Sequence, residues 1–277
     1  MSDPLDVATN CTVHACTTTN PLDMTKMIPL VTGGGSGIGY GLVCEFLKRG
    51  SPKVIITGRR DKVLQEAASK HPEGKIAYKV SDAGSAQDRE ALFLWIKAEH
   101  PDCNALVNNA GIQRRIGAVD DLRACWAQRA PEIEINFAGP VHLTSLFLPY
   151  FLSRRHHEQC MIAQVSSGLA FVPFAGGPVY GATKAALHSY TMAMRYSMVE
   201  TNVKMVEIVP PAVKTNLGGS HNFGEDCAEF CAHVMERIEK GELEVGYKFS
   251  ETGRLADRAT LDGMVTQVAS MMNVKKF

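Results

Sequence analysis

Short apolar runs alternate with longer amphipathic stretches along this chain of 277 residues. The runs are rich in Val and Ile and have the length of strands in a parallel sheet that is covered on both faces. They fall at residues 27–32, 53–57, 76–80, 105–107, 161–165, 203–209 and 243–247. Between them apolar residues recur at helical spacing, as at Leu42, Val43 and Phe46. The alternation continues without a linker, which predicts a single α/β domain over residues 27–277: a doubly wound, parallel sheet of about seven strands with helices on both faces.

The first 26 residues differ from the rest, because they are rich in Thr and show no apolar period. We expect them to form a loose extension. They lack the apolar core of a secretion signal, and the absence of arginine argues against an organelle transit peptide. No later segment is long and apolar enough to span a bilayer. We therefore expect a cytoplasmic protein that does not bind membranes.

The charge balance excludes another class of partner. Lys plus Arg and Asp plus Glu are equal in number, at 29 each, and the pI is about 7.1. Such a chain carries no broad basic field, so we expect no nucleic-acid partner.

A glycine-rich turn, GGGSGIG at residues 33–39, joins the first predicted strand to the first amphipathic stretch. Glycines permit a tight turn and let the backbone and the helix N-terminus approach a pyrophosphate. A plain flexible turn is the alternative, but a strand before it and a helix after it are the context of a dinucleotide site.

The second strand is followed by Arg59 and Arg60, with no acidic residue at that point. A fold that selects NAD usually places an acid there for the ribose 2′-hydroxyl, whereas arginine forks match a 2′-phosphate. NADP(H) is therefore favoured over NAD(H), with Arg59 on the phosphate and Arg60 opening the next helix in solvent. Asp82, after the third strand, can accept from the adenine amino group, can cap the following helix, or can do both.

Tyr180 and Lys184 are four residues apart in a predicted helix, so they share a face. A cation beside the phenol draws the tyrosine pKa down from about 10 toward neutrality, where acid–base catalysis is efficient. Ser167 can donate a hydrogen bond to a substrate oxygen at the same place. Taken alone, a Tyr/Lys pair is equally typical of a solvated helix face, and its meaning depends on the glycine turn.

Asparagines complete the pattern. Asn108 and Asn109 follow the fourth strand, where an asparagine often only caps a turn. Asn136 begins another long helical stretch, and we expect it to bend the backbone and to bind a water behind Lys184.

In this order the motifs resemble those of the short-chain dehydrogenase/reductase family, over about residues 26–250. The family's TGxxxGIG matches residues 32–39, its NNAG matches residues 108–111, and its YxxxK matches Tyr180 and Lys184. Within the family, LVNNAGIQ, VSSGLAF and PVYGATKAALHS look most like the DltE-type oxidoreductases. The resemblance implies a Rossmann fold and a nicotinamide cofactor.

The resemblance also implies roles for residues. Catalysis would belong to Asn136, Ser167, Tyr180 and Lys184. The cofactor would be held by Gly33, Ser36, Gly37, Ile38, Gly39, Arg59, Asp82, Asn109, Ala110, Gly111, Tyr180, Lys184, Pro210, Val213 and Thr215. The substrate would meet Gln113, Leu169, Phe174 and a loop at about residues 211–226. The family usually has Pro-Gly where this chain has Pro210 and Pro211, so we expect a stiffer loop here.

Together these features predict an NADP(H)-dependent carbonyl reductase or alcohol dehydrogenase that acts on a small, apolar carbonyl or alcohol, with Tyr180 as general acid and base. A non-catalytic NADP-binding sensor on the same fold is the alternative. A homodimer or homotetramer is expected through helices at about residues 138–155 and 180–199, as in the family.

The eight cysteines do not change this interpretation, because the chain has no CxxC pair. Cys44, Cys103, Cys125 and Cys160 are interpreted as incidental thiols. Cys227 and Cys231 lie four apart on a predicted helix, where packing is favoured over metal binding. His156 and His157 suit a solvated helix end. We expect no metal site.

Overall fold

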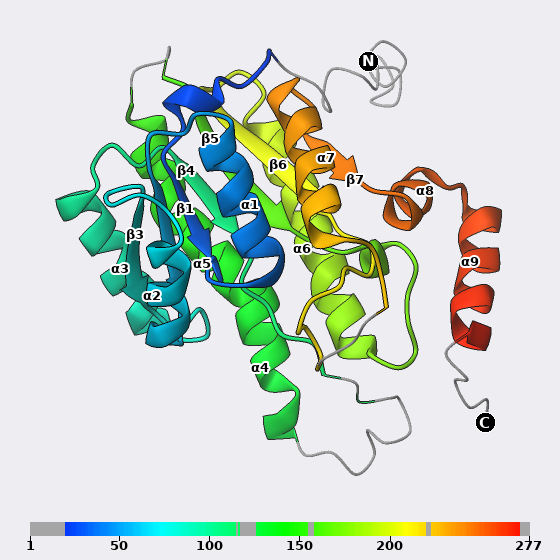
Figure 1. Ribbon diagram of the computed structural model, residues 1–277. Helices are drawn as coiled ribbons and strands as arrows, with labels where there is room; N and C mark the ends of the chain where they lie inside the picture. The colour runs from blue at the N-terminus through cyan, green and yellow to red at the C-terminus, as the bar shows by residue number, and fades with distance from the viewer. Residues whose placement is uncertain (1–19, 115, 117–125, 155–157, 220–222, 272–277) are drawn as a thin grey trace, which may run out of the picture.

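The computed structural model describes residues 20–114, 116, 126–154, 158–219 and 223–271. Seven parallel strands form one sheet in the order β3-β2-β1-β4-β5-β6-β7 (Figure 1). Their bounds are β1 (Pro29–Thr32), β2 (Val54–Gly58), β3 (Ile76–Val80), β4 (Ala105–Asn108), β5 (Cys160–Val165), β6 (Val203–Val209) and β7 (Glu244–Gly246). Each of the seven predicted strands is found, because short runs rich in β-branched residues favour the extended backbone of a sheet. The doubly wound fold is confirmed.

Helices cover both faces of the sheet (Figure 1). One face carries α1 (Gly37–Lys48), α2 (Asp61–Ser69) and α7 (Cys227–Glu239), and the other carries α3 (Ala86–Glu99), α5 (Gly139–Leu152) and α6 (Pro178–Ser197). The short α4 (Ala130–Ile133) precedes α5, while α8 (Phe249–Leu255) and α9 (Arg258–Met271) follow β7. Among the described residues, no helix is both long and apolar enough to cross a membrane.

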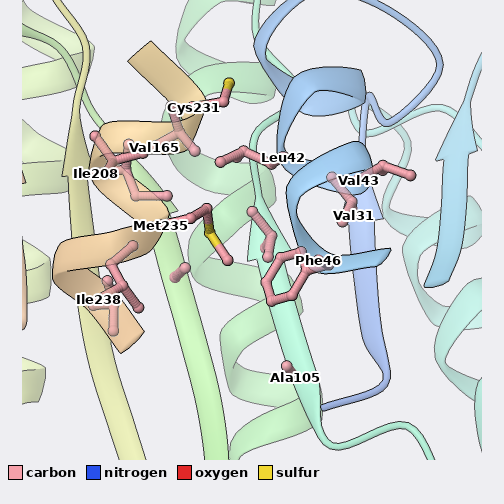
Figure 2. Close-up of a cluster of buried hydrophobic side chains, with 14 of the residues drawn as sticks. Val31, Leu42, Val43, Phe46, Ala105, Val165, Ile208, Cys231, Met235 and Ile238 are labelled. Atoms are coloured by element: carbon pink, nitrogen blue, oxygen red, sulfur yellow. The ribbon is translucent and has the colours of Figure 1, made fainter. Parts of the chain in front are cut away.

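The first core lies between the sheet and the α1–α7 layer. Figure 2 shows Leu42 and Phe46 of α1 on the side of that helix that faces Met235 of α7, above the strands. A Cβ atom added to Gly41 would lie 2.6 Å from the Cys231 sulfur, so α7 approaches α1 closely at this glycine. Cys231 is fully buried there, which is the packing role expected of it.

The second core lies on the opposite face, under α3, α5 and α6. Phe147 and Phe151 of α5 are fully buried and pack with Leu92 and Ile96 of α3 against β4 and β5. The two cores fix the sheet from both sides, so the ends of its strands form a rigid edge on which a site can be built.

Residues 20–26 depart from the sequence expectation of a loose extension. Leu22 and Met24 are buried in the first core, at 2% and 1% exposure. The Leu22 N–H donates to the Glu239 carbonyl at the end of α7, and a short 3₁₀ turn covers Met24–Lys26. Two isolated apolar residues show no period, which is why the pattern missed this segment. Residues 1–19, Cys125, His156 and His157 lie outside the described residues.

Candidate active site

A cavity of about 1840 Å³ opens along the carboxyl edge of the sheet. Its walls come from the turns after β1, β2, β3 and β4, the exit of β5, the first turns of α6 and the segment after β6. Parallel strands all present their carboxyl ends to this edge, so residues distant in sequence meet there.

Thr32 and Asn109 fasten the glycine turn to the neighbouring strand. The Thr32 hydroxyl accepts from the Asn109 and Ala110 N–H groups, each at 3.0 Å. The Asn109 amide donates to the Thr32 carbonyl at 2.9 Å. Gly33 has φ of 65°, and a Cβ on Gly39 would lie 2.3 Å from the Gly33 carbonyl oxygen. Both positions therefore require glycine, and the turn brings the α1 N-terminus to the cavity wall.

Positive charge gathers at one end of the cavity. Ser36 precedes α1 without capping it through its side chain, so the first N–H groups of the helix are left to the cavity. Arg59 and Arg60 are both exposed and both line the cavity. Arg60 also donates to the Ser36 hydroxyl at 3.4 Å. As expected from the sequence, Arg60 is exposed and directly precedes α2, and it also stands beside the glycine turn with Arg59.

Asp82 lines the cavity, but it does not cap α3 as one alternative proposed. Its side chain accepts from the Gly84 N–H at 2.9 Å, and Ser85 is the residue that caps α3 through the Asp88 N–H. The Asp82 carboxylate stabilises its own turn, because an aspartate side chain readily accepts from the backbone N–H two residues further on.

Tyr180, Lys184 and Ser167 meet on one wall of the cavity. Pro178 opens α6, which places Tyr180 in the first turn and Lys184 one turn later. All three side chains are at most 7% exposed, yet all three residues line the cavity. The Lys184 ammonium donates to the Val165 carbonyl at 2.7 Å and lies 5.8 Å from the centre of the Tyr180 ring.

Burial governs both pKa values at this wall. It raises the pKa of Tyr180 to about 12; a hydrogen bond with Ser167 acts against this and the Glu132 charge adds to it. Burial lowers the pKa of Lys184 to about 8, against the attraction of Glu207. The expectation of a Tyr180 pKa lowered by Lys184 is therefore wrong for this arrangement. The ammonium is bound to Val165, and desolvation of the phenolate is the larger effect.

Asn136 lies behind this wall, fully buried, and does not line the cavity. Its side chain accepts from the Ile112 N–H at 2.9 Å and donates to the Ile112 carbonyl at 2.8 Å. It also donates to Thr183 of α6 at 3.3 Å. The helix is widened to a π-turn over Glu134–Ala138, so its regular α-helical hydrogen bonding is interrupted around Asn136. Asn136 thus ties the segment after β4 to α6.

The opposite end of the cavity is more apolar. Gln113, Leu169 and Phe174 all line it, as expected from the sequence. The Phe174 ring lies against Gly176, where an added Cβ would come within 2.2 Å of the ring. Phe171 does not line the cavity; its ring packs on His188 at 4.4 Å between centroids.

The segment after β6 folds back on itself beside the glycine turn. Lys214 donates its N–H to the Glu225 carbonyl at 2.9 Å, and the Glu225 N–H donates to the Ala212 carbonyl at 2.8 Å. Pro210 accepts from the Gly168 N–H at 2.8 Å, which joins this segment to the exit of β5. Thr215 lies against Gly37, where a Cβ would be 3.3 Å from its methyl carbon.

Most of the expected site residues are therefore brought together. Of those expected to touch cofactor or substrate, Gly39 alone stands behind the cavity wall rather than on it, and Asn136 of the catalytic set does the same. Sequence reasoning missed Arg60, Phe249 and Val268, which also line the cavity, whereas Lys214 lies in the loop predicted at about residues 211–226. Only Arg60 had a signal, the doubled arginine. Phe249 and Val268 come from helices after β7, whose course no motif predicted.

A family model described as short chain dehydrogenase matches residues 27–226. The chain belongs to the short-chain dehydrogenase family. The resemblance inferred from the motifs, including that to DltE-type oxidoreductases, is confirmed.

Three known proteins illustrate the likeness. The uncharacterized oxidoreductase DltE of Bacillus subtilis (strain 168) is 37% identical over 259 residues, covering 91% of this chain and 100% of DltE. The NADP-dependent 3-hydroxy acid dehydrogenase YdfG of Escherichia coli (strain K12) is 32% identical over 187 residues, covering 68% of this chain and 73% of YdfG. A solved structure, the closed form of serine dehydrogenase complexed with NADP⁺, superposes with a TM-score of 0.70 at 25% identity, covering 80% of this chain and 94% of that one.

Proposed function

We propose that this protein is an NADP(H)-dependent oxidoreductase that interconverts a small, apolar carbonyl compound and its alcohol, with Tyr180 as general acid and base. One observation carries the proposal. Ser167, Tyr180 and Lys184 face a single cavity whose far end is formed by the glycine turn and two arginines. A proton donor and a dinucleotide cradle in one cavity are the two parts that a carbonyl reductase needs.

The residues present fit a nicotinamide dinucleotide. Gly33 and Gly37 have positive φ, at 65° and 55°, and leave room at the α1 N-terminus for a pyrophosphate. The guanidinium groups of Arg59 and Arg60 match a 2′-phosphate. An NADP-dependent relative such as YdfG supports this choice of cofactor. Lys184 would hold the nicotinamide ribose, in keeping with its place beside Gly111 on the cavity wall.

When bound, the nicotinamide supplies a hydride to the carbonyl carbon. Ser167 and Tyr180 then act on the carbonyl oxygen. The Ser167 hydroxyl donates a hydrogen bond to it, and the Tyr180 phenol donates the proton that turns the developing alkoxide into the alcohol. A Tyr180 pKa of about 12 keeps the phenol protonated at neutral pH, which is the form that reduction needs.

Lys184 stabilises the Tyr180 phenolate that forms when the proton is donated. After Tyr180 gives up its proton it is a buried phenolate, which is costly without a nearby cation. The Lys184 ammonium is the cation in reach, and with a pKa of about 8 it is mostly protonated at pH 7. Asn136 holds the segment around Ile112 against α6, which fixes the distance across this wall.

The substrate end favours an apolar group next to the reacting carbonyl. Leu169, Phe174 and Leu217 supply apolar surface there, and Gln113 supplies one neutral amide. A ketone or aldehyde with an apolar or aromatic substituent fits this lining better than a highly charged one.

The test is NADPH oxidation with a panel of aldehydes, ketones and diketones, run on the wild type and on Tyr180→Phe. We expect the variant to lose at least about 100-fold in kcat, because general acid catalysis contributes that much, while NADPH binding by fluorescence is retained. Tyr247→Phe is the matched control, since Tyr247 packs on Phe230 away from the cavity lining. A Tyr180→Phe enzyme with the wild-type rate contradicts the mechanism. NADPH binding with no turnover of any carbonyl favours the non-catalytic sensor.

A further inference from the structure

A row of polar side chains crosses the sheet next to α6. Asn108, Gln164, Glu207 and Glu244 stand directly opposite one another on β4, β5, β6 and β7. The first three are at most 2% exposed. The interior of a parallel sheet is normally apolar, and a fully buried carboxylate is costly, so Glu207 requires a reason.

The partners of Glu207 come from α6 and β7. His188 places Nδ1 at 2.9 and 3.1 Å from the two carboxylate oxygens. Arg195 lies 3.7 Å from one of them and donates to Glu244 at 2.8 Å. Glu207 is thus held by hydrogen bonds on the face of the sheet that α6 covers.

Helix α6 connects the Glu207 cluster with the wall that carries Tyr180 and Lys184. Tyr180, Lys184 and His188 follow one another at four-residue spacing, so they form one stripe along the face of α6 that meets the sheet. Lys184 is 4% exposed, and its ammonium donates to the Val165 carbonyl, which is neutral. Glu207 is the group whose charge opposes the loss of the Lys184 proton.

A metal ion is the competing explanation for this cluster. The ligand atoms of His188, Glu207 and Glu244 lie within 4.8 Å of one another. However, the Arg195 guanidinium already bonds Glu244 and approaches Glu207, and Arg254 lies 3.6 Å from Glu244. Two arginines balance two carboxylates, so a further cation would meet repulsion. The cluster is explained without a metal.

We propose that Glu207 is a positioning residue for Lys184: its buried carboxylate, held by His188, is the countercharge that keeps the Lys184 side chain an ammonium ion beneath Tyr180. The inference rests on the proposed function, because Lys184 serves catalysis only if Tyr180 transfers a proton. It extends the active site from the cavity wall to a residue on β6 that does not line the cavity.

The sign of the effect follows from the groups around Glu207. They are Lys184, His188 and Arg195 on α6, Glu244 on β7 with Arg254 behind it, and the neutral Gln164 on β5. Removal of the Glu207 charge leaves the burial of Lys184 unopposed, so the lysine loses its proton at a lower pH. Activity that needs the ammonium then falls at a lower pH.

The first test is the pH profile of kcat/KM for carbonyl reduction in Glu207→Gln. We expect the alkaline limb to move to lower pH by about one unit. This is the lower end of the pKa change that a nearby opposite charge produces. Glu207→Asp keeps the charge and should restore the limb. Glu244→Gln is the matched control, because it neutralises a carboxylate of the same cluster that bonds Arg195 instead. A purely structural role predicts lower stability in both glutamine variants and the wild-type limb in both, and that result overturns the proposal.

The second test does not depend on turnover. The Lys184 side chain is titrated by NMR in protein with labelled lysine, with the signal assigned by its loss in Lys184→Met. A lower titration midpoint in Glu207→Gln supports the proposal even if no carbonyl is reduced, which separates it from the proposed function. An unchanged midpoint overturns it. If Glu207→Gln does not fold, His188→Arg fixes a permanent cation on Glu207 and should lower the same midpoint.

Discussion

Lys184 carries a charged side chain at a buried position. Its pKa is lowered by burial from 10.5 to about 8, so between these values the unfolded chain binds a proton that the folded chain does not. Stability therefore rises with pH across that window, and the cost of burying the ammonium is fully present below it. The active site retains this group at the expense of folding free energy, as expected of a functional residue.

Replacement of the lysine should reveal that cost. We expect Lys184→Met to be more stable than the wild type at pH 7, and the gap in unfolding free energy to shrink by about 2 kcal/mol at pH 9.5. Urea unfolding at the two pH values measures the gap. Lys62→Met serves as control, because Lys62 is an exposed lysine on α2. A constant gap for Lys184→Met would mean that the lysine titrates as it does in water.

At the scale of elements, the segment at residues 20–26 acts as a clamp on the amino edge of the sheet. Besides the bond from Leu22 to Glu239, the Gln159 side chain accepts from the Asp23 N–H and donates to the Pro21 carbonyl. The segment thus joins the end of α7 to the start of β5 on the side of the sheet away from the cavity. Its contribution is to stability.

Two substitutions measure that contribution. We expect Leu22→Ala or Met24→Ala to cost about 2–5 kcal/mol of unfolding free energy, because each leaves a cavity in the first core. Thr25→Ala, at an exposed position of the same segment, should cost less than about 1 kcal/mol. Denaturant midpoints give the comparison. Equal and small costs at all three positions would contradict the clamp.

The elements also show why the sequence predicted some features and missed others. The strand β6 was found at residues 203–209 as predicted, because its Val/Ile pattern is local. The alignment of Glu207 with Gln164 and Glu244 is a matter of register between strands, and no local pattern reports it. The Tyr180–Lys184 spacing was visible because it repeats with the helix. The direction of the Tyr180 pKa was not, since it depends on burial by distant segments.

At the scale of the whole molecule, the two cores and the cavity meet at the carboxyl edge of the sheet. The cores on both faces fix where the strands end, and the turns after those strands line the cavity. Residues from before β2 to after β7 line the same cavity. A ligand that spans this cavity contacts several turns that are far apart in sequence and are held together by the sheet. Its binding should therefore stabilise the whole folded molecule.

Thermal unfolding with cofactor tests this linkage and the choice of nucleotide together. At 100 times its dissociation constant a ligand adds about 2.7 kcal/mol, which corresponds to a rise in Tm of several degrees for a domain of this size. We expect NADP⁺ to raise Tm more than NAD⁺ at equal concentration, because in the proposed function Arg59 and Arg60 bind the 2′-phosphate. Arg59→Asp should abolish the difference and Lys62→Glu, an equal charge change on nearby α2, should preserve it. Equal Tm shifts with both nucleotides in the wild type would contradict the role of Arg59 in binding the 2′-phosphate. Arg59 and Arg60 would then only precede helix α2.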